Sequence, residues 1–349
     1  TVGDSRLSIT DVYWIIVEIE TDAGLTGTGW MGSLGFGPDV LSQIVESQFE
    51  EILLGRDPFE LTAIHEDLRR QTIYYGETGM AAWPRGAIDV ALWDLKAKAA
   101  GEPLFRFLGG EQRRIPAYAS LMDATEDDRE VVAERHGRYA EEGFSAFKTK
   151  VGNRSATEEA ARVEGIRAAV GDEAEIFVDA NQAWTVSEAI EHATALDAHD
   201  VGWVEEPISE YDLRGHDRVA SRMAPPLATG EMFYRPERFE HLFDVGAVGV
   251  VQPDLIRLGG ISGMQEAAAM AHRHNRPLAP HFYYAVSAHV VSAAPTGKIA
   301  EYIPAYDIAP VLSDPPTVEE GHVVLPERPG HGYEIADGAR SEYGADPTD

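Results

Sequence analysis

The chain has 349 residues, carries a net charge of −30 and contains no cysteine. This length accommodates two domains or one large barrel with an addition. The absence of cysteine excludes disulfides, zinc–thiolate sites and a cysteine nucleophile. Binding phosphates requires a basic surface, so nucleic acid is not an expected partner.

The acidic residues are spread along the whole chain, which is typical of proteins kept soluble at high salt, so we interpret the charge as a halophilic adaptation. No secretory signal pattern opens the sequence and no apolar run is long enough to cross a bilayer. We therefore expect no membrane partner and a cytoplasmic location. Only five of the 29 basic residues are lysines, so two of them on one short stretch, Lys148 and Lys150, need an explanation.

The N-terminal part predicts an α+β unit over residues 1–112. Residues 11–20 and 25–30 are rich in β-branched and aromatic side chains and predict two strands around a turn. Apolar residues at helical spacing then predict three helices, over residues 38–54, 58–71 and 84–100.

From residue 113 to residue 315, short apolar runs alternate with helical stretches. Repeated strand–helix units of this kind close most economically into a parallel barrel. Eight strands are predicted, at 116–120, 146–151, 175–180, 202–206, 227–231, 249–254, 278–282 and 299–303. Helices are predicted between most of them, including 128–142, 157–170, 186–198 and 262–274.

No helix is expected after the eighth strand, because the chain becomes proline-rich and irregular beyond residue 303. The remaining tail, residues 316–349, predicts two short strands at 321–326 and 330–335. It is too short to fold alone, so we expect it to return to the N-terminal unit.

Three carboxylates follow buried runs at equal intervals. Asp179 and Glu205 are 26 residues apart, and so are Glu205 and Glu231. A buried carboxylate is costly unless it is paired or bound to a cation, and oxygen ligands suit a hard dication such as Mg²⁺. An ion-pair network with arginines is the alternative, but few arginines occur on the nearby strands. We therefore predict a metal site at the carboxyl ends of these strands.

Other polar side chains are expected at the same end of the barrel. Lys148 and Lys150 share a face of one strand, because side chains two apart do so. Partial burial beside a second cation lowers the pKa of a lysine, which could then act as a base. Glu206 is expected to point away from its neighbour Glu205 and to have a structural role or to form a salt bridge. Asn181 shares a face with Asp179, and we assign it to substrate binding together with Lys148 and with Glu301.

His281 also follows an apolar run, and Asp254, one unit earlier, is placed to hold its imidazole and raise its pKa. Glu301 on the last strand is expected to be protonated among other acids, so that it donates a hydrogen bond to an oxyanion. A dication between a lysine and a histidine implies removal of a proton alpha to a carboxylate through an enediolate.

At these residues the chain resembles the mandelate racemase subgroup of the enolase superfamily, and its motifs are most similar to those of acid-sugar dehydratases. The matching motifs are Phe147-Lys-Thr-Lys150, Val178-Asp-Ala-Asn181, Val204-Glu-Glu-Pro207, Thr229-Gly-Glu231, Gln252-Pro-Asp254, Pro280-His281 and Glu301. The resemblance implies a (β/α)7β barrel with an N-terminal α+β capping domain that the C-terminal tail completes.

The resemblance also implies roles. Mg²⁺ is the cofactor, Lys150 and His281 are the two acid/base groups, and Lys148 and Glu301 steady the enediolate. The substrate is a sugar acid, and the protein is expected to be a homo-oligomer, as dimer or octamer.

Several outcomes remain open at this point. Dehydration of a sugar acid is the leading hypothesis. The alternatives on the same site are racemisation or epimerisation of a 2-hydroxy acid and opening of a sugar lactone. A non-catalytic carboxylate-binding protein is the alternative from another class. The chain begins close to Asp11, so the first cap strand and most of the mobile loop that follows it in the family are expected to be lacking. Candidate specificity residues lie on the cap, at 30–36, Tyr74, Tyr75 and Trp83.

Overall fold

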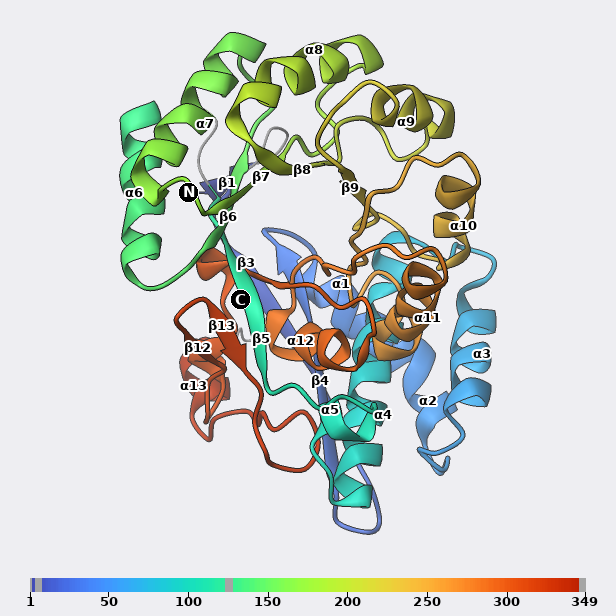
Figure 1. Cartoon of the computed structure of the whole chain (residues 1–349). Coiled ribbons are helices and arrows are strands. Elements are labelled where there is room, and N and C mark those ends of the chain that lie inside the picture. The colour runs from blue at the N-terminus through green and yellow to red at the C-terminus, as the bar shows by residue number, and fades with distance from the viewer. Residues whose placement is uncertain (1, 4–7, 123–127, 345–349) are drawn as a thin grey trace.

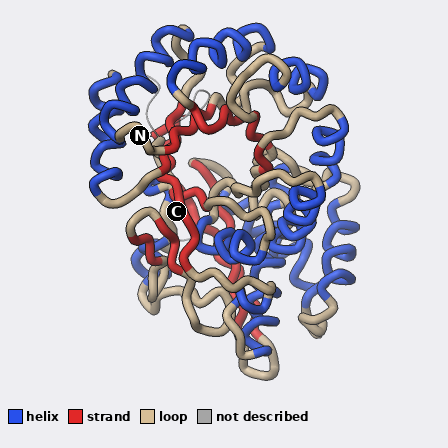
Figure 2. Tube along the Cα trace, viewed as in Figure 1, coloured by secondary structure: helices blue, strands red, loops and turns tan. Residues whose placement is uncertain are grey.

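The structure, a computed structural model, describes residues 2–3, 8–122 and 128–344. Its centre is a ring of parallel strands with helices on the outside (Figures 1 and 2). The strands of the ring are β5 (Arg114–Ser120), β6 (Ala146–Lys150), β7 (Glu175–Asp179), β8 (Val201–Glu205), β9 (Leu227–Thr229), β10 (Val250–Val251) and β11 (Ala300–Tyr302).

The strands from β5 to β10 are neighbours in chain order, and β11 returns to pair with β5 in parallel. The prediction of a strand at 278–282 is wrong, because the structure has only isolated bridges there. The place of this strand in the ring is taken by single bridges from Leu278 to Val251 and to Gly297. Pro277 and Pro280 flank this segment, and proline has no N–H to donate to a ladder. The bridges still close the ring, so the predicted barrel is confirmed.

The outer layer consists of α6 (Arg129–Glu141), α7 (Ala156–Val170), α8 (Val186–Leu196), α9 (Leu213–Ala220), α10 (Glu237–Asp244), α11 (Gly260–Arg273) and α12 (Tyr284–Ala293). Capping boxes at Ser155 and Thr185 begin α7 and α8. After β11, two short 3₁₀ turns (Pro304–Tyr306 and Ala309–Val311) stand where another helix would follow, as the prolines predicted.

Large side chains fill the inside of the ring below its carboxyl ends. Phe177 and Trp203 are stacked, and the ring of Tyr118 meets both edge-on. All three side chains are fully buried. The barrel is therefore a packed core that supports whatever lies at its carboxyl-terminal mouth.

The N-terminal unit is a hairpin with helices. Strands β3 (Val12–Glu20) and β4 (Thr26–Leu34) pair antiparallel, and short strands β1 (Val2–Gly3) and β2 (Ser8–Ile9) pair before them. Its helices are α1 (Pro38–Ile44), a π-helical turn (Val45–Phe49), α2 (Glu50–Leu53), α3 (Leu61–Thr72), a 3₁₀ turn (Gly79–Ala81), α4 (Trp83–Ala100) and α5 (Leu104–Phe107). The predicted helix at 38–54 is therefore continuous, with a π turn inside it.

Strand β4 lies directly on α4 because it carries glycines. A Cβ on Gly27 would lie 2.2 Å from the carbonyl oxygen of Ala91, and one on Gly29 would lie 2.1 Å from that of Ala87. No larger residue fits this approach. The contact sets how far the end of β4 reaches over the barrel.

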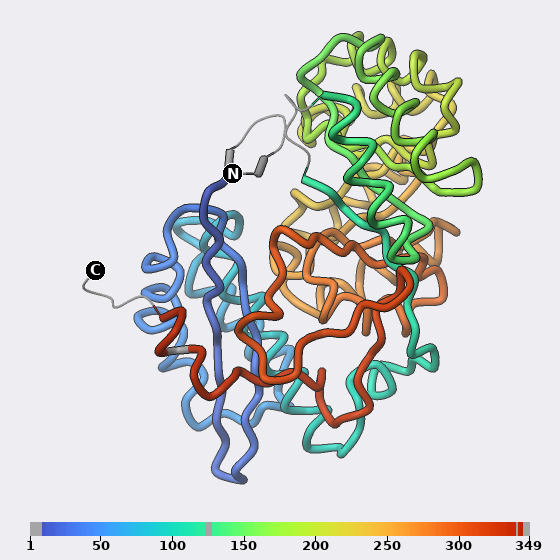
Figure 3. The backbone as a smooth tube through the Cα atoms, turned by 90° about the vertical axis from the view of Figure 1, so that its left-hand side faces the viewer, coloured from blue at the N-terminus to red at the C-terminus, as the bar shows by residue number. Residues whose placement is uncertain are grey.

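The tail joins the two parts. Strands β12 (Thr317–Glu319) and β13 (His322–Val324) form a hairpin, and β13 pairs antiparallel with β5. Residues 330–335 are not the predicted strand, since they form only isolated bridges, from Gly330 to Pro103 and from Ile335 to Leu312. His331 donates its N–H to Asp94 (2.9 Å), and its Nε2 lies 2.8 Å from the carbonyl oxygen of Thr28. Helix α13 (Ala339–Tyr343) follows, and Figure 3 shows this last segment in red against the blue N-terminal unit.

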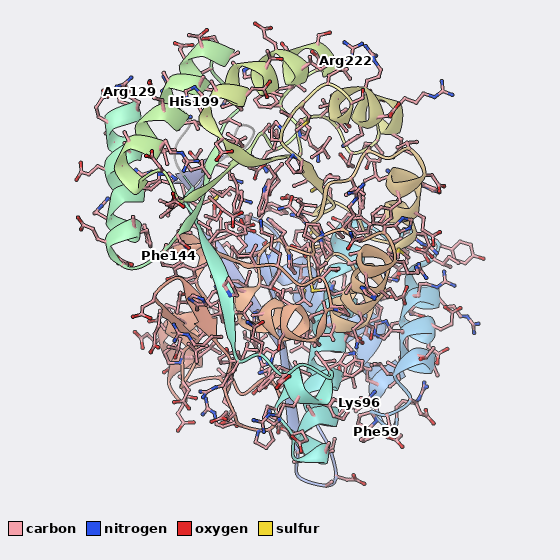
Figure 4. All side chains as sticks on the ribbon, in the orientation of Figure 1. Phe59, Lys96, Arg129, Phe144, His199 and Arg222 are labelled. Atoms are coloured by element: carbon pink, nitrogen blue, oxygen red, sulfur yellow. The ribbon has the colours of Figure 1, made fainter. Side chains whose placement is uncertain are left out.

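Polar contacts fasten α4 to the barrel helix α11. Asp89 accepts hydrogen bonds from the backbone N–H (3.0 Å) and the hydroxyl (2.6 Å) of Ser262, and Trp93 Nε1 donates to the same hydroxyl. At the outer edge of α4, the ammonium of Lys96 lies 5.8 Å from the ring of Phe59 (Figure 4). In the described part of the chain, no helix combines the length and apolar character needed to cross a membrane.

We predict that Asp94→Ala lowers the free energy of unfolding by about 3 kcal/mol. Asp94 is fully buried and holds three segments: it accepts from the N–H groups of Thr28 and His331, and it pairs with Lys98 at 2.7 Å. Urea unfolding measures the change, with Asp22→Ala in an exposed turn as control. A loss no larger than that of the control contradicts the role of Asp94 as a clamp.

A second prediction concerns His65, whose Nε2 lies 2.5 Å from Asp89 Oδ2. Burial lowers the pKa of His65, but the carboxylate of Asp89 outweighs burial and leaves this pKa raised. The stability from this pair is therefore fully present below the ordinary histidine pKa and is lost as pH rises through the folded-state pKa. Urea unfolding at pH 5.5, 7 and 9 should show a gap between wild type and His65→Gln that narrows with rising pH. A gap that widens contradicts the assignment.

Candidate active site

Three carboxylates meet at the mouth of the barrel. Asp179 ends β7 and Glu205 ends β8, and the two are paired in register. Glu231 lies two residues beyond the end of β9 and reaches the same point. One oxygen from each side chain lies within 4.8 Å of the others, and all three side chains are buried. Carboxylates this close repel one another unless a cation lies among them, and their oxygens suit Mg²⁺.

Both lysines of β6 point into this cluster, as predicted. Lys148 Nζ lies 2.6 Å from Glu205 Oε1 and 3.6 Å from Asp179 Oδ2. Lys150 Nζ lies 2.5 Å from Asp179 Oδ2. The lysine side chains are almost fully buried, so these ion pairs are strong.

The expected lowering of the lysine pKa values is wrong, because the neighbouring carboxylates raise them. Burial lowers the pKa of Lys148, but Glu205 and Glu301 outweigh it and raise this pKa well above its usual value. Burial likewise lowers the pKa of Lys150, and Asp179 outweighs it. The reason is that each ammonium is closer to a carboxylate than to the other ammonium. A dication held by Asp179 would compete for the oxygen that now binds Lys150.

The Asp254–His281 pair forms as predicted. His281 Nδ1 lies 2.9 Å from Asp254 Oδ2, and its Nε2 lies 3.5 Å from Glu231 Oε2. Asp254 is held in turn by the backbone N–H groups of Ile256 and Arg257 at 2.9 and 2.8 Å. Burial lowers the pKa of His281, but Glu231 and Asp254 outweigh it and raise that pKa.

Glu301 lies in the cluster, but its surroundings lower its pKa, against the expectation that it is protonated. Its Oε1 lies 2.7 Å from Lys148 Nζ, and its Oε2 accepts a hydrogen bond from the N–H of Phe282 at 2.8 Å. Burial raises the pKa of Glu301, but Lys148 and His281 outweigh it and lower this pKa to about 2. With the ammonium of Lys148 at one oxygen and a backbone N–H at the other, the charged form of the carboxyl group is favoured.

Two further residues were expected near the triad. The prediction that Asn181 shares a strand face with Asp179 does not apply, because β7 ends at Asp179. Asn181 instead adopts a left-handed conformation (φ 44°) and still lines the cavity described below. Glu206 points away from Glu205 as expected, is buried, and accepts a hydrogen bond from Gln182 Nε2 at 2.9 Å.

Other contacts of the cluster were not found from the sequence. Glu205 Oε2 accepts from Trp203 Nε1 (3.1 Å) and from Gln252 Nε2 (2.8 Å), which orients the carboxylate. Arg257 Nη1 lies 3.0 Å from the carbonyl oxygen of Glu231 and 3.4 Å from its Oε1. The position of Trp203, two residues before Glu205 on one strand, was a usable signal; the other two contacts cross between strands and loops.

A cavity of about 380 Å³ lies over the cluster. The barrel contributes to its wall Lys150, Asn181, Glu231, Asp254, His281 and Glu301. The cap contributes Gly32, Leu34 and Phe36 from the end of β4 and the loop after it, together with Trp83 at the start of α4. The candidate bases, one metal ligand and the cap therefore face one enclosed space.

The other cap residues singled out in the sequence are not part of this wall. Trp30 is buried, and its ring lies 5.2 Å from that of His331. Tyr74 and Tyr75 are 99% and 60% exposed and line no part of the cavity. Their assignment to specificity is wrong, since the loop after α3 places them on the outside of the cap.

Fold and site together define an α/β-barrel protein with a buried carboxylate cluster for a divalent cation. The family model for "Mandelate racemase / muconate lactonizing enzyme, N-terminal domain" matches residues 4–109. The family model for "Enolase C-terminal domain-like" matches residues 130–339. The chain belongs to the enolase superfamily.

Similar proteins of known activity cover nearly the whole chain. L-talarate/galactarate dehydratase of Salmonella typhimurium is 33% identical over 95% of this chain and 83% of its own length. The 3,6-anhydro-alpha-L-galactonate cycloisomerase of Streptomyces coelicolor is 31% identical over 93% and 90%. A solved mutant of L-talarate/galactarate dehydratase, liganded with Mg and L-glucarate, has a TM-score of 0.91 at 31% identity, over 97% of this chain and 87% of that one. The triad Asp179, Glu205 and Glu231 fits the same cation.

We predict that Mg²⁺ raises the thermal unfolding midpoint of the wild type and that Glu231→Gln removes most of this shift. A cation that binds only the folded state adds about 2.7 kcal/mol when present at a hundredfold excess over its Kd. Calorimetry with Mg²⁺ and then with excess EDTA measures the effect. Glu240→Gln, on the outer helix α10, is the matched control and should keep the full shift. A shift that survives in Glu231→Gln contradicts the assigned site.

Proposed function

We propose that the protein is a Mg²⁺-dependent dehydratase of a sugar acid. One observation carries the proposal: a candidate base lies at each of two metal ligands within one cavity, Lys150 at Asp179 and His281 at Glu231. Several similar proteins are dehydratases of sugar acids, among them the L-talarate/galactarate dehydratase and an arabinonate dehydratase. A non-catalytic protein would have no need for both bases beside a carboxylate cluster.

The proposed reaction starts with the substrate carboxylate directed to the triad. Asp179, Glu205 and Glu231 would hold Mg²⁺, which would supply positive charge to the substrate carboxylate and to the enediolate. Lys150 or His281 takes the proton from the alpha carbon, and the electron pair of that C–H bond enters the enediolate. Lys148, held by Glu205 and Glu301, adds positive charge beside it.

In the second half of the proposed reaction, His281 acts as the acid that helps the beta hydroxyl leave. Asp254 holds its Nδ1, which leaves Nε2 for exchange of the proton. The imidazolium gives its proton to the beta hydroxyl, the C–O bond breaks, and water leaves. The resulting enol tautomerises to a 2-keto-3-deoxy sugar acid. Glu301, as an anion, keeps Lys148 and the backbone of Phe282 in position and contacts the substrate from the cavity wall.

Two bases also fit racemisation or epimerisation of a 2-hydroxy acid, and the similarity to a cycloisomerase supports sugar-lactone opening as a second candidate. All these reactions share the enediolate. Incubation with Mg²⁺ and a panel of aldonic and aldaric acids, with semicarbazide detection of 2-keto acids, distinguishes them. Exchange of the alpha proton with solvent deuterium without a keto product would count against dehydration.

We predict that Lys150→Ala and His281→Asn each lower kcat on the best substrate by about 10²- to 10⁴-fold, the usual contribution of a positioned acid or base. Lys298→Ala and His241→Asn are the matched controls, because both residues lie outside the cavity. Circular dichroism checks that the variants fold. If turnover survives both changes in the site, the catalytic assignment is wrong.

A further inference from the structure

The turn that follows His281 has a strained backbone. Phe282 and Tyr283 both adopt left-handed conformations, with φ of 54° and 47°. Glycine enters this region freely, but a residue with a large side chain is destabilised there by about 1–3 kcal/mol. Such a conformation persists only where the surroundings hold it. Because the turn begins directly after a candidate acid/base group, the contacts that hold the turn also affect where that group lies.

The barrel holds the turn through its backbone atoms. The N–H of Phe282 donates to Glu301 Oε2 at 2.8 Å. The hydroxyl of Ser287, in the first turn of α12, lies 2.8 Å from the carbonyl oxygen of Phe282 and 2.7 Å from that of Tyr283. Both strained residues are therefore tied to the barrel by hydrogen bonds to their main chain.

The cap holds the same turn through side chains. The hydroxyl of Tyr283 accepts a hydrogen bond from the N–H of Gly32 on β4 at 2.9 Å. The ring of Trp14 on β3 lies 5.7 Å from that of Phe282 and 6.2 Å from that of Tyr283, between ring centres. A Cβ on Gly32 would lie 3.2 Å from the Trp14 ring and 3.4 Å from the Phe282 ring. The cap hairpin is therefore in close contact with both strained residues.

His281 lies between the barrel and this turn. Its N–H donates to the carbonyl oxygen of Pro253 at 3.0 Å, and its Nδ1 lies 2.9 Å from Asp254 Oδ2. On its other side the chain enters the turn that contacts the cap. Lys150 is held differently, by the pairing of β6 with β7. Loss of the cap contact should therefore act on the imidazole rather than on the lysine.

We propose that Tyr283 is a positioning residue that couples the docking of the cap to the orientation of His281. Its hydroxyl ties the cap strand to the strained turn, and the turn sets the direction in which the imidazole points. The inference rests on the proposed function, in which His281 is the acid, and goes beyond it by adding a residue that acts through His281. Tyr283 also lines the cavity, so the test separates this role from direct contact with the substrate.

The first arm of the test needs no substrate. Tyr283→Phe removes only the hydroxyl. Tyr284→Phe is the matched control, because that hydroxyl also belongs to a buried tyrosine and lies 2.7 Å from Asp307. The imidazole Cε1–H signal of His281 is observed by NMR with Mg²⁺ present and is assigned by its loss in His281→Asn. We expect the signal to be displaced or broadened in Tyr283→Phe and to match wild type in Tyr284→Phe. An unchanged signal in Tyr283→Phe overturns the proposal.

The second arm is a double-mutant cycle on the best acid of the substrate panel. We expect Tyr283→Phe to lower kcat by about tenfold or more with little change in KM, since a misplaced catalytic group reduces the rate by up to about 10²-fold. In the His281→Asn background the same change should have no further effect, because two changes that act through one group are not additive. An equal loss in both backgrounds shows that Tyr283 acts on the substrate directly and overturns the proposal.

The third arm approaches the turn from the cap. Trp14→Leu removes the aromatic contact, and Trp14 is not among the described residues that line the cavity. Tyr13→Leu, at the exposed neighbouring position of β3, is its control. We expect Trp14→Leu to lower kcat in the wild type and to have no effect in His281→Asn. A folded Trp14→Leu protein with the kcat of Tyr13→Leu contradicts the role of the cap.

Failure of the proposed function has a different signature. If no acid of the panel reacts, or if His281→Asn keeps full turnover, the assigned chemistry is wrong. The NMR comparison still decides the positioning role in that case, because it requires only the folded protein. A displaced signal in Tyr283→Phe alone then supports the coupling of the cap to the imidazole, and an unchanged signal overturns it.

Discussion

The structure depends on keeping several carboxylates buried within a few ångströms of one another. Asp179, Glu205 and Glu231 would repel strongly in this poorly solvated place if nothing offset their charge. Lys148 and Lys150 supply part of that charge. Mg²⁺ held by the triad would add positive charge at the same point. The rigid barrel is needed because this balance fails if any member moves by an ångström or two.

The cap serves the same buried cluster of charges by covering it. A charged site is most effective when water is excluded, and the end of β4 with Trp83 covers the barrel mouth. The close contact of β4 on α4 and the buried clamps at Asp89 and Asp94 set the position of that cover. The cap brings neutral side chains over a charged centre, which is why its composition bears on the substrate.

Much of the site was predictable because parallel barrels bring the carboxyl ends of their strands together. The lysine pair, the triad and the Asp254–His281 pair all lie where the strand pattern placed them. The equal spacing of the three acids, however, is not equal register. Glu205 pairs with Ala228 on β9, and Glu231 reaches the site from three residues further along. Predictions that needed side-chain surroundings were less successful: Lys148 lies beside Glu301 and lowers its pKa, and Tyr74 and Tyr75 lie outside the cavity.

The amino-acid sequence alone determined the barrel, the cap and the set of acids, lysines and histidine, because hydrophobic periodicity and strand-end position are local properties of the chain. Only the tertiary structure decided which charges are paired, which cap residues cover the site, and that the segment around Leu278 closes the ring through bridges. Those features depend on contacts between segments far apart in the chain, such as Glu205 with Gln252 and Asp94 with His331. Local patterns carry no record of such contacts, since the distance between two side chains is set by how the whole barrel and cap pack.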